Sequence, residues 1–228
     1  MDLFLVRHGE SESNAKISES RDSVLTPLGA QQAERAAEAL RAESIERLYC
    51  SPQQRALQTA AILCRALGIR PQVWVELSEH GLSGPEVGLP RSVIERRFPD
   101  FDLPPSVDEA GWARHWEQES TEELAARMGR VAAEIRNWHA EGVPERAALV
   151  IHGGSGTMLL RHLLGISPAL DVRFGHTNCG ITRLRFEGET VRVLYLNDQR
   201  HLVGLPERTE VPNAMGPAKE VTRRPEAV

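Results

Sequence analysis

Two arginines and two histidines stand where a folded sheet would bring them together. Arg7 and His8 directly follow an apolar run near the N-terminus, and His152 directly follows another apolar run. Arg55 stands one turn into the helix expected after a third such run. The carboxyl ends of parallel strands share one edge of a sheet, so we expect the four side chains to converge there. Unpaired charge is costly in a core, whereas this set is a good receptor for a phosphate dianion.

These residues are carried by short apolar runs that alternate with amphipathic helical segments. Such alternation is typical of a parallel sheet with helices on both faces. We therefore expect an α/β fold with three α/β/α layers around a mainly parallel sheet. The expected strands are 3–6, 48–50, 73–75 and 147–151, followed by a closing hairpin of 181–186 and 191–196. The expected helices are 27–42, one that starts at Ser51-Pro52 and stops at Gly68, a short one at 91–98, one from the Ser120 cap to His139, and one from the glycines after His152 to Leu164.

The expected domain organisation has one insertion and one tail. Residues 84–119 are rich in glycine and proline and have no regular pattern beyond the short helix, so we interpret them as an inserted lid. Residues 206–228 hold few large apolar side chains and are expected to form a flexible tail. The rest predicts a single domain over residues 1–205 that contains the insertion.

Composition limits the partners and the location. The net charge of −5 argues against a nucleic-acid binder, and no apolar run approaches the roughly 18 residues that span a bilayer. We expect no nucleic-acid or membrane partner and a cytoplasmic location, and a homodimer stays open. Cys50, Cys64 and Cys179 lack a paired spacing, so we expect three buried free thiols and neither a disulfide framework nor a zinc site.

Five short motifs follow one another along roughly the first 200 residues. They are Arg7-His8-Gly9-Glu10-Ser11 with Asn14, Leu25-Thr26-Pro27-Leu28-Gly29, Ser51-Pro52 with Arg55-Ala56 and Thr59-Ala60, Leu77-Ser78-Glu79, and Val150-Ile151-His152-Gly153-Gly154. The first and third motifs together form a highly specific pair. In content and order the set resembles the histidine phosphatase superfamily, which has the phosphoglycerate mutase-like fold.

The resemblance implies that His8 is a nucleophile that forms a phosphohistidine. Positive charge from Arg7, Arg55 and His152 disfavours the imidazolium form of His8 and keeps one ring nitrogen available for attack. The same groups stabilise the transferring phosphoryl group, so neither a metal nor another cofactor is expected. The resemblance also places the general acid at Glu79, where repulsion from a bound phosphate dianion helps the carboxyl to keep its proton.

Three further residues are expected to bind phosphate or substrate. Asn14 and the backbone N–H of Gly153, at the start of a helix, would hold phosphate oxygens. Asn178 matches a polar position that the family often has before a late strand, and a turn-forming asparagine explains it nearly as well. No residue is assigned to a metal.

The sequence thus predicts a metal-independent phosphomonoester hydrolase of the histidine acid phosphatase type, with a small phosphorylated substrate. One alternative is a phosphoglycerate mutase-type phosphotransferase, but residues 84–119 contain no lysine and lack the segment that mutases carry there. Another is a non-catalytic phosphate-binding signalling module, although such relatives usually lose the histidine found here at position 8. A serine hydrolase is disfavoured because the glycines around Ser155 miss the nucleophile spacing of those enzymes by one residue.

Overall fold

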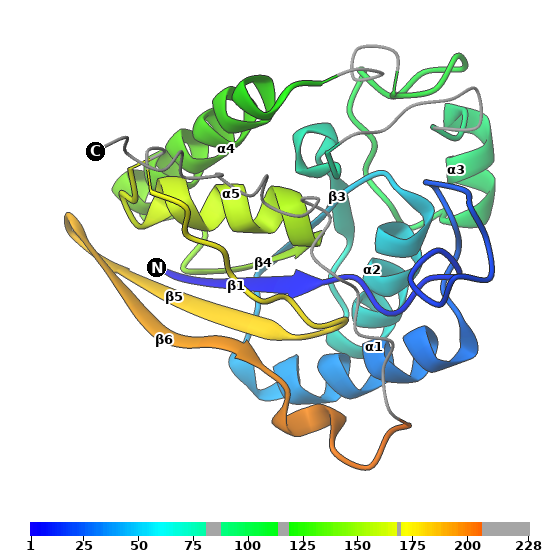
Figure 1. The fold of residues 1–228 in the computed structure, drawn as a ribbon, viewed down its shortest axis with the longest axis horizontal. Coiled ribbons are helices and arrows are strands. Elements are labelled where there is room, and N and C mark those ends of the chain that lie inside the picture. Colours follow the sequence, from blue (N-terminus) through cyan, green and yellow to red (C-terminus); the bar gives the residue numbers. More distant parts are fainter. Residues whose placement is uncertain (81–87, 114–118, 168–169, 207–228) are drawn as a thin grey trace, which may run out of the picture.

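The computed structural model describes residues 1–80, 88–113, 119–167 and 170–206, in which a six-stranded sheet lies between helices (Figure 1). The strands, in their order across the sheet, are β3 (Pro71–Val73), β2 (Arg47–Cys50), β4 (Arg146–Ile151), β1 (Asp2–Arg7), β5 (Ile181–Glu187) and β6 (Thr190–Asp198). The first four strands of this order are parallel, whereas β5 and β6 run antiparallel and close one edge. The predicted α/β fold with a mainly parallel sheet is confirmed.

Helices cover both faces of the sheet because the central strands are apolar on both sides. The helices are α1 (Pro27–Leu40), α2 (Gln54–Leu67) and the short α3 (Arg91–Arg97) on one side, and α4 (Thr121–Glu141) and α5 (Gly153–Leu163) on the other. Along β1, Phe4 and Val6 belong to the apolar cluster with α1 and α2, while Leu3 and Leu5 belong to the cluster with α4 and α5. This alternation follows the two-residue period of a strand and produces the three predicted layers.

The largest departures from the expected elements lie around the second and third strands. The second long helix was expected to start at Ser51-Pro52, but Gln53 is its N-cap, because the Ser51 hydroxyl accepts the Gln53 N–H and holds the chain outside the helix. The third strand was expected at 73–75, but it ends at Val73. Residues Val75–Leu77 form a 3-10 turn, η2, which leads the chain out of the sheet.

The remaining elements agree with the sequence to within a few residues at their ends. The capping box at the start of α4 is confirmed, since Ser120 and Glu123 exchange side-chain and backbone hydrogen bonds. Helix α1 ends at Leu40 rather than at residue 42, and a 3-10 turn follows over Arg41–Glu43. The short helix at 91–98 and the closing hairpin are also found.

The described part of the 84–119 insertion packs on the domain. Ile94, Phe101, Val107 and Trp112 join the apolar cluster with α1 and α2. Asp102 exchanges backbone hydrogen bonds with Pro71 and Val73 and so covers the outer edge of β3. The rest of the insertion, at 84–87 and 114–118, and the tail at 207–228 lie outside the described residues, so the lid stays a prediction.

The cysteines are free, and the expectation that all three are buried was wrong for one of them. Cys50 and Cys179 are buried, whereas Cys64 is only partly buried. Cys64 follows Leu63 on α2 and thus lies one position off the buried stripe of that helix. No helix in the described ranges is long and apolar enough to cross a membrane.

Candidate active site

His8 lies at the carboxyl end of β1 with each ring nitrogen in a defined role. Its Nδ1 is 2.7 Å from the Gly9 carbonyl oxygen, which can only accept, so Nδ1 carries the proton. Its Nε2 accepts a hydrogen bond from Arg55 Nε at 3.1 Å and therefore carries the lone pair. Burial, Arg55 and Arg7 together hold the pKa of His8 well below its usual range. The imidazole is thus a neutral base with Nε2 directed at an arginine.

His152, Arg7 and Arg55 surround this ring. The His152 ring is fully buried, and its centroid is 4.9 Å from that of His8. Burial, Arg55, His8 and Arg7 hold the pKa of His152 well below its usual range. The side chains of Arg7 and Arg55 are anchored at one end by carbonyl oxygens, those of His176 at 2.5 Å and Arg21 at 2.6 Å.

Some polar atoms of this group are buried and have no protein partner. Both ring nitrogens of His152 and Nε of Arg7 are in this state among the described residues. A buried donor without a partner costs about 1–3 kcal/mol, more when it is charged, and such groups concentrate at binding sites. Two arginine forks and two imidazoles can hold a compact dianion such as phosphate. We call His8, Arg7, Arg55 and His152 the phosphate cradle.

Close backbone packing fixes the loop after β1. A Cβ atom on Gly9 would lie 2.3 Å from the Gly29 carbonyl oxygen, so a side chain at this position would push α1 away. The Gly9 N–H donates to Thr59 Oγ1 at 3.0 Å, and that hydroxyl donates to the Arg55 carbonyl at 2.7 Å. The loop after β1 is therefore tied to α2, the helix that supplies Arg55.

Asn178 and Asn14 hold the backbone next to the cradle. The Asn178 amide nitrogen donates to the His8 carbonyl and to Asn14 Oδ1, both at 3.0 Å. Asn178 is buried, so this contact fixes the backbone that carries His8. Asn14 Oδ1 also accepts the Ser11 N–H at 3.3 Å. These bonds give both asparagines a role in holding the loop, and their predicted contact with phosphate stays a prediction.

Glu79 lies at the same edge of the sheet, at the N-terminus of α5. Its two carboxylate oxygens accept the N–H groups of Gly154 at 2.9 Å and Ser155 at 2.8 Å. Its own N–H donates to Gln53 Oε1 at 2.8 Å. Burial lowers the pKa of Arg7 to about 10, and the negative charge of Glu79 opposes this lowering. The amides that follow Gly153 thus hold a carboxylate, at the helix end where the sequence predicted an N–H contact to phosphate.

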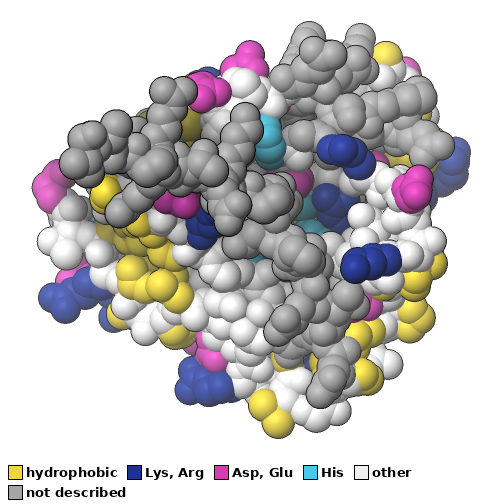
Figure 2. Space-filling view, viewed as in Figure 1, with side chains coloured by type: hydrophobic (Ala, Val, Ile, Leu, Met, Phe, Trp, Pro, Cys, Tyr) yellow, Lys and Arg dark blue, Asp and Glu magenta, His cyan; other side chains and the backbone are white. Residues whose placement is uncertain are grey.

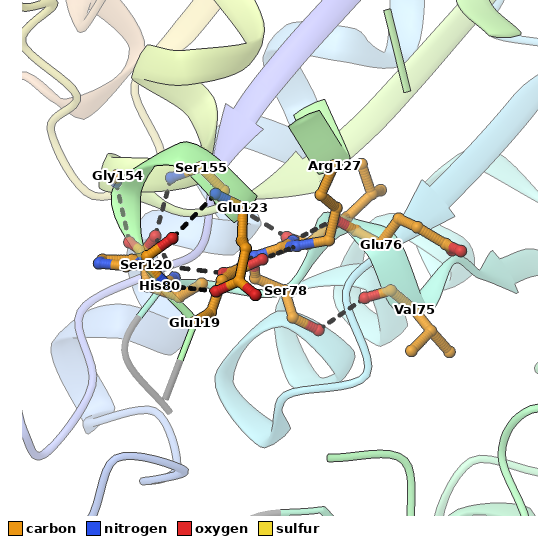
Figure 3. A network of polar contacts seen from close by, with 12 residues as sticks. Val75, Glu76, Ser78, His80, Glu119, Ser120, Glu123, Arg127, Gly154 and Ser155 are labelled. Atoms are coloured by element: carbon orange, nitrogen blue, oxygen red, sulfur yellow. Dashed lines mark hydrogen bonds and ion pairs between the residues drawn. The ribbon is translucent and has the colours of Figure 1, made fainter. Parts of the chain in front are cut away.

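The sequence analysis missed the residues that hold the Glu79 loop, above all Arg127 and Glu119. Arg127 comes from α4 and lies between Glu119 and the backbone carbonyls of Glu76 and Ser78 (Figure 3). One signal was present in the sequence. Arg127 lies on the stripe of α4 that is otherwise formed by apolar side chains, next to Leu124 and Met128, and an arginine in such a stripe needs a buried partner.

The charge around the site is positive near the histidines. On the face shown in Figure 2, histidine side chains are visible near the centre, with lysine or arginine side chains beside them. Among the residues that the structure describes, no group of three or more His, Cys, Asp or Glu side chains could hold a metal ion. Arg55 and Arg7 are the charged side chains that act on the His8 ring.

Comparison with known proteins points to one family. The family model of the histidine phosphatase superfamily (branch 1) matches residues 3–199. "Putative phosphoserine phosphatase 2" of Hydrogenobacter thermophilus is 31% identical over 207 residues, which cover 87% of this chain and 96% of that protein. "Probable phosphoglycerate mutase GpmB" of Photorhabdus laumondii is 31% identical over 199 residues, which cover 82% and 86%.

Solved structures agree with this grouping. A mycobacterial glucosyl-3-phosphoglycerate phosphatase, solved with VO3, is 26% identical and superposes with a TM-score of 0.61. The match covers 86% of this chain and 98% of that one. A putative α-ribazole-5'-P phosphatase of Escherichia coli shares the fold, with a TM-score of 0.66 at 21% identity over 87% of this chain and 98% of that one. The chain belongs to the histidine phosphatase superfamily, branch 1.

Proposed function

We propose that this protein hydrolyses a small phosphomonoester through a phosphohistidine on His8 Nε2. The observation that carries the proposal is the pair of bonds on the His8 ring. The Gly9 carbonyl accepts a hydrogen bond from the Nδ1–H group, and Nε2, which carries the lone pair, accepts one from Arg55 Nε at 3.1 Å. A neutral imidazole with one oriented lone pair is a competent nucleophile toward phosphorus.

The first half of the reaction transfers the phosphoryl group to the protein. Arg55 would exchange its bond to Nε2 for a phosphate oxygen, while Arg7 and His152 donate to other oxygens. The Nε2 lone pair forms the P–N bond as the P–O ester bond breaks, and the negative charge passes to the leaving oxygen. Glu79 in its protonated form gives that oxygen a proton, which releases an alcohol.

The second half returns the protein to its starting state. The Glu79 carboxylate, now without its proton, takes one from a water molecule that attacks phosphorus. The P–N bond breaks, its electrons return to Nε2, and inorganic phosphate leaves. The arginine forks match the equatorial oxygens in both halves, so these residues supply the charge stabilisation that the transition state needs.

The names of the relatives suggest which esters to test. Two of them are named for phosphoserine and glucosyl-3-phosphoglycerate, which are phosphomonoesters of small molecules that also carry a carboxylate. We propose a substrate of this class. A panel of phosphoserine, phosphoglycerates, sugar phosphates and nucleotides, with released phosphate as the readout, tests the assignment.

A mutase activity is the second candidate, because other relatives at 31% identity are named phosphoglycerate mutases. A mutase would return the phosphoryl group to a hydroxyl of a phosphoglycerate instead of to water. Incubation with 3-phosphoglycerate and a trace of bisphosphoglycerate separates the two reactions. We expect inorganic phosphate, whereas 2-phosphoglycerate as the main product would favour the mutase.

The intermediate is tested by rapid quench with a ³²P-labelled ester in the presence of EDTA. We expect a base-stable, acid-labile label on the wild-type protein and none on His8→Ala. A label on a serine would reassign the nucleophile. Activity that is lost in EDTA and restored by a divalent metal would contradict the metal-independent mechanism.

A further inference from the structure

The segment that carries Glu79 has little secondary structure of its own. The 3-10 turn η2 ends at Leu77, and Ser78, Glu79 and His80 follow outside any helix or strand. Such a segment needs bonds from other elements to keep one carboxylate in place. Arg127 supplies them from α4, because its Nη1 donates to the backbone carbonyl of Glu76 and, at 2.9 Å, to that of Ser78.

Arg127 is itself held by a buried carboxylate. Its Nε and Nη2 donate to the two oxygens of Glu119, each at 2.6 Å, in a bidentate pair. The side chains are 2% and 5% exposed. Glu119 directly precedes Ser120, the N-cap whose capping box fixes the start of α4. Both members are therefore tied to α4, at residue 127 within the helix and at residue 119 before its first turn.

The pair contacts the segment on both sides of Glu79. Arg127 binds the carbonyl of Ser78, the residue before Glu79. On the other side, Glu119 Oε2 is 3.6 Å from Nδ1 of His80, the residue after Glu79. Figure 3 shows this network, with Arg127 near Glu76, Glu119 near His80, and Gly154 and Ser155 on the side of the network away from Glu76.

A buried ion pair adds little to the stability of a fold, because desolvation offsets most of its Coulomb energy. An apolar residue at position 127 would continue the buried stripe of α4. The carbonyl groups of residues 76 and 78 would then lose their donor. The feature that an apolar residue cannot replace is the directional hold on the Glu79 segment.

We propose that Arg127, paired with Glu119, is a positioning residue that holds Glu79 where it can give a proton to the leaving group. This inference rests on the proposed function, in which Glu79 is the general acid. Arg127 donates to Glu119 and to the carbonyls of residues 76 and 78, so it acts on proton transfer through the backbone that carries Glu79. Its charge also acts on His152, and Arg127→Lys keeps that charge. Attack by His8 on an ester that needs no proton should therefore change little in that variant.

The kinetic test compares two classes of ester in Glu119→Gln and Arg127→Lys. Glu119→Gln keeps size but removes the charge opposite Arg127, and Arg127→Lys keeps the charge but loses the planar fork. For an alkyl phosphate with a poor leaving group, we expect kcat/KM to fall by about 10- to 100-fold in both variants, part of the contribution of a general acid. For an aryl phosphate with an acidic phenol, the change should stay within about 3-fold. Arg130→Gln, an exposed arginine on the same helix, is the matched control.

A double-variant cycle distinguishes positioning from general destabilisation. If Arg127 and Glu119 act through Glu79, then Glu119→Gln should cause no further loss on the alkyl ester once Glu79→Gln is present. Multiplicative losses, or equal losses on the two esters, would overturn the inference. If Arg127→Lys does not fold, Glu119→Gln alone decides.

A measurement without substrate separates this inference from the proposed function. Hydrogen exchange of the Gly154 and Ser155 amides reports whether the Glu79 carboxylate remains bound to them. We expect protection of both amides to fall in Glu119→Gln and to persist in Arg130→Gln. Unchanged protection in Glu119→Gln would overturn the inference. Lost protection together with a wild-type protein that hydrolyses neither ester would support the positioning role and reject the proposed function.

Discussion

The phosphate cradle and the Glu79 segment meet at one edge of the sheet, but they are held there by different means. The cradle histidines directly follow the central strands β1 and β4, and the His8 N–H continues the strand pairing by donating to the Ile151 carbonyl at 2.9 Å. The Glu79 segment follows a short strand and a 3-10 turn, and side chains of α4 and Gln53 hold it. The cradle histidines are placed by main-chain ladders, with further support from the Asn178 side chain, whereas the Glu79 segment depends mainly on side-chain contacts.

This difference predicts that side-chain replacements have different effects in the two halves of the site. Main-chain ladders persist when one side chain is replaced, so a cradle variant removes a chemical group and leaves its surroundings in place. In the Glu79 segment, a variant of a supporting residue moves the group without removing it. Cradle variants should therefore give large losses on every ester, whereas variants of the Glu79 segment should give losses that depend on the leaving group.

The largest effect is expected from His8→Ala. The variant lacks the nucleophile, so kcat/KM should fall by more than roughly 10⁴-fold on alkyl and aryl esters alike. The fold should be retained, because the backbone bonds of His8 to Ile151 and Asn178 do not involve its ring. His139→Gln, a histidine of α4 remote from the cradle, is the matched control. Residual turnover with a labelled protein intermediate would reject His8 as the nucleophile.

Glu79→Gln should separate the two halves of the site. It keeps the size of the side chain but has no proton to give, so the alkyl ester should lose about 10²–10⁴-fold in kcat/KM. The aryl ester should still form the phosphohistidine quickly and then release phosphate slowly, which stopped-flow detection of the phenol would record as a burst. An equal loss on both esters, without a burst, would reject Glu79 as the general acid.

Much of the cradle could be predicted because its signals are local in the sequence. Continuous apolar runs identify strands buried on both faces, and the residues that end those runs must lie at the sheet edge. Arg7, His8 and His152 were found in this way. The capping box of Ser120 was equally visible, since both of its partners lie within one turn.

The support of Glu79 could not be predicted, because it depends on contacts between distant segments. Arg127 binds carbonyls about fifty residues earlier in the chain, and carbonyl acceptors leave no trace in the sequence. The misplaced third strand has a related cause. Residues 73–75 are apolar and β-branched or aromatic, which favours a strand, but the chain there turns away from the sheet and tertiary context decides.

Arg55→Lys is expected to have an intermediate effect within the cradle. Arg55 donates from Nε to His8 Nε2 and from Nη1 to the Arg21 carbonyl. Lysine keeps the charge, but without the planar fork it cannot make both contacts at the same time. We expect kcat/KM to fall by about 10²-fold on both ester classes. Arg65→Lys, an exposed arginine on the same helix, is the matched control. Activity close to wild type would show that only the charge at position 55 matters.

The smallest effect concerns stability, and it tests whether His176, next to the cradle, makes the free energy of unfolding depend on pH. His176, whose carbonyl anchors Arg7, has its pKa lowered to about 4 by burial and by Arg7. In the unfolded chain a histidine titrates near 6.5, so between pH 6.5 and 4 the unfolded state binds a proton that the native state does not. The contribution of His176 to the free energy of unfolding should therefore be complete above pH 6.5 and should be lost as the pH falls toward 4.

Replacing His176 removes one such proton. In His176→Gln, the difference in unfolding free energy between pH 7 and pH 5 should shrink by about 2 kcal/mol relative to wild type. Urea unfolding at the two pH values measures it, with His139→Gln as the control for loss of a histidine. A residual dependence should remain, since the pKa values of His8 and His152 are lowered as well. A variant with the same pH dependence as the wild type would show that His176 is not buried as a neutral ring beside Arg7.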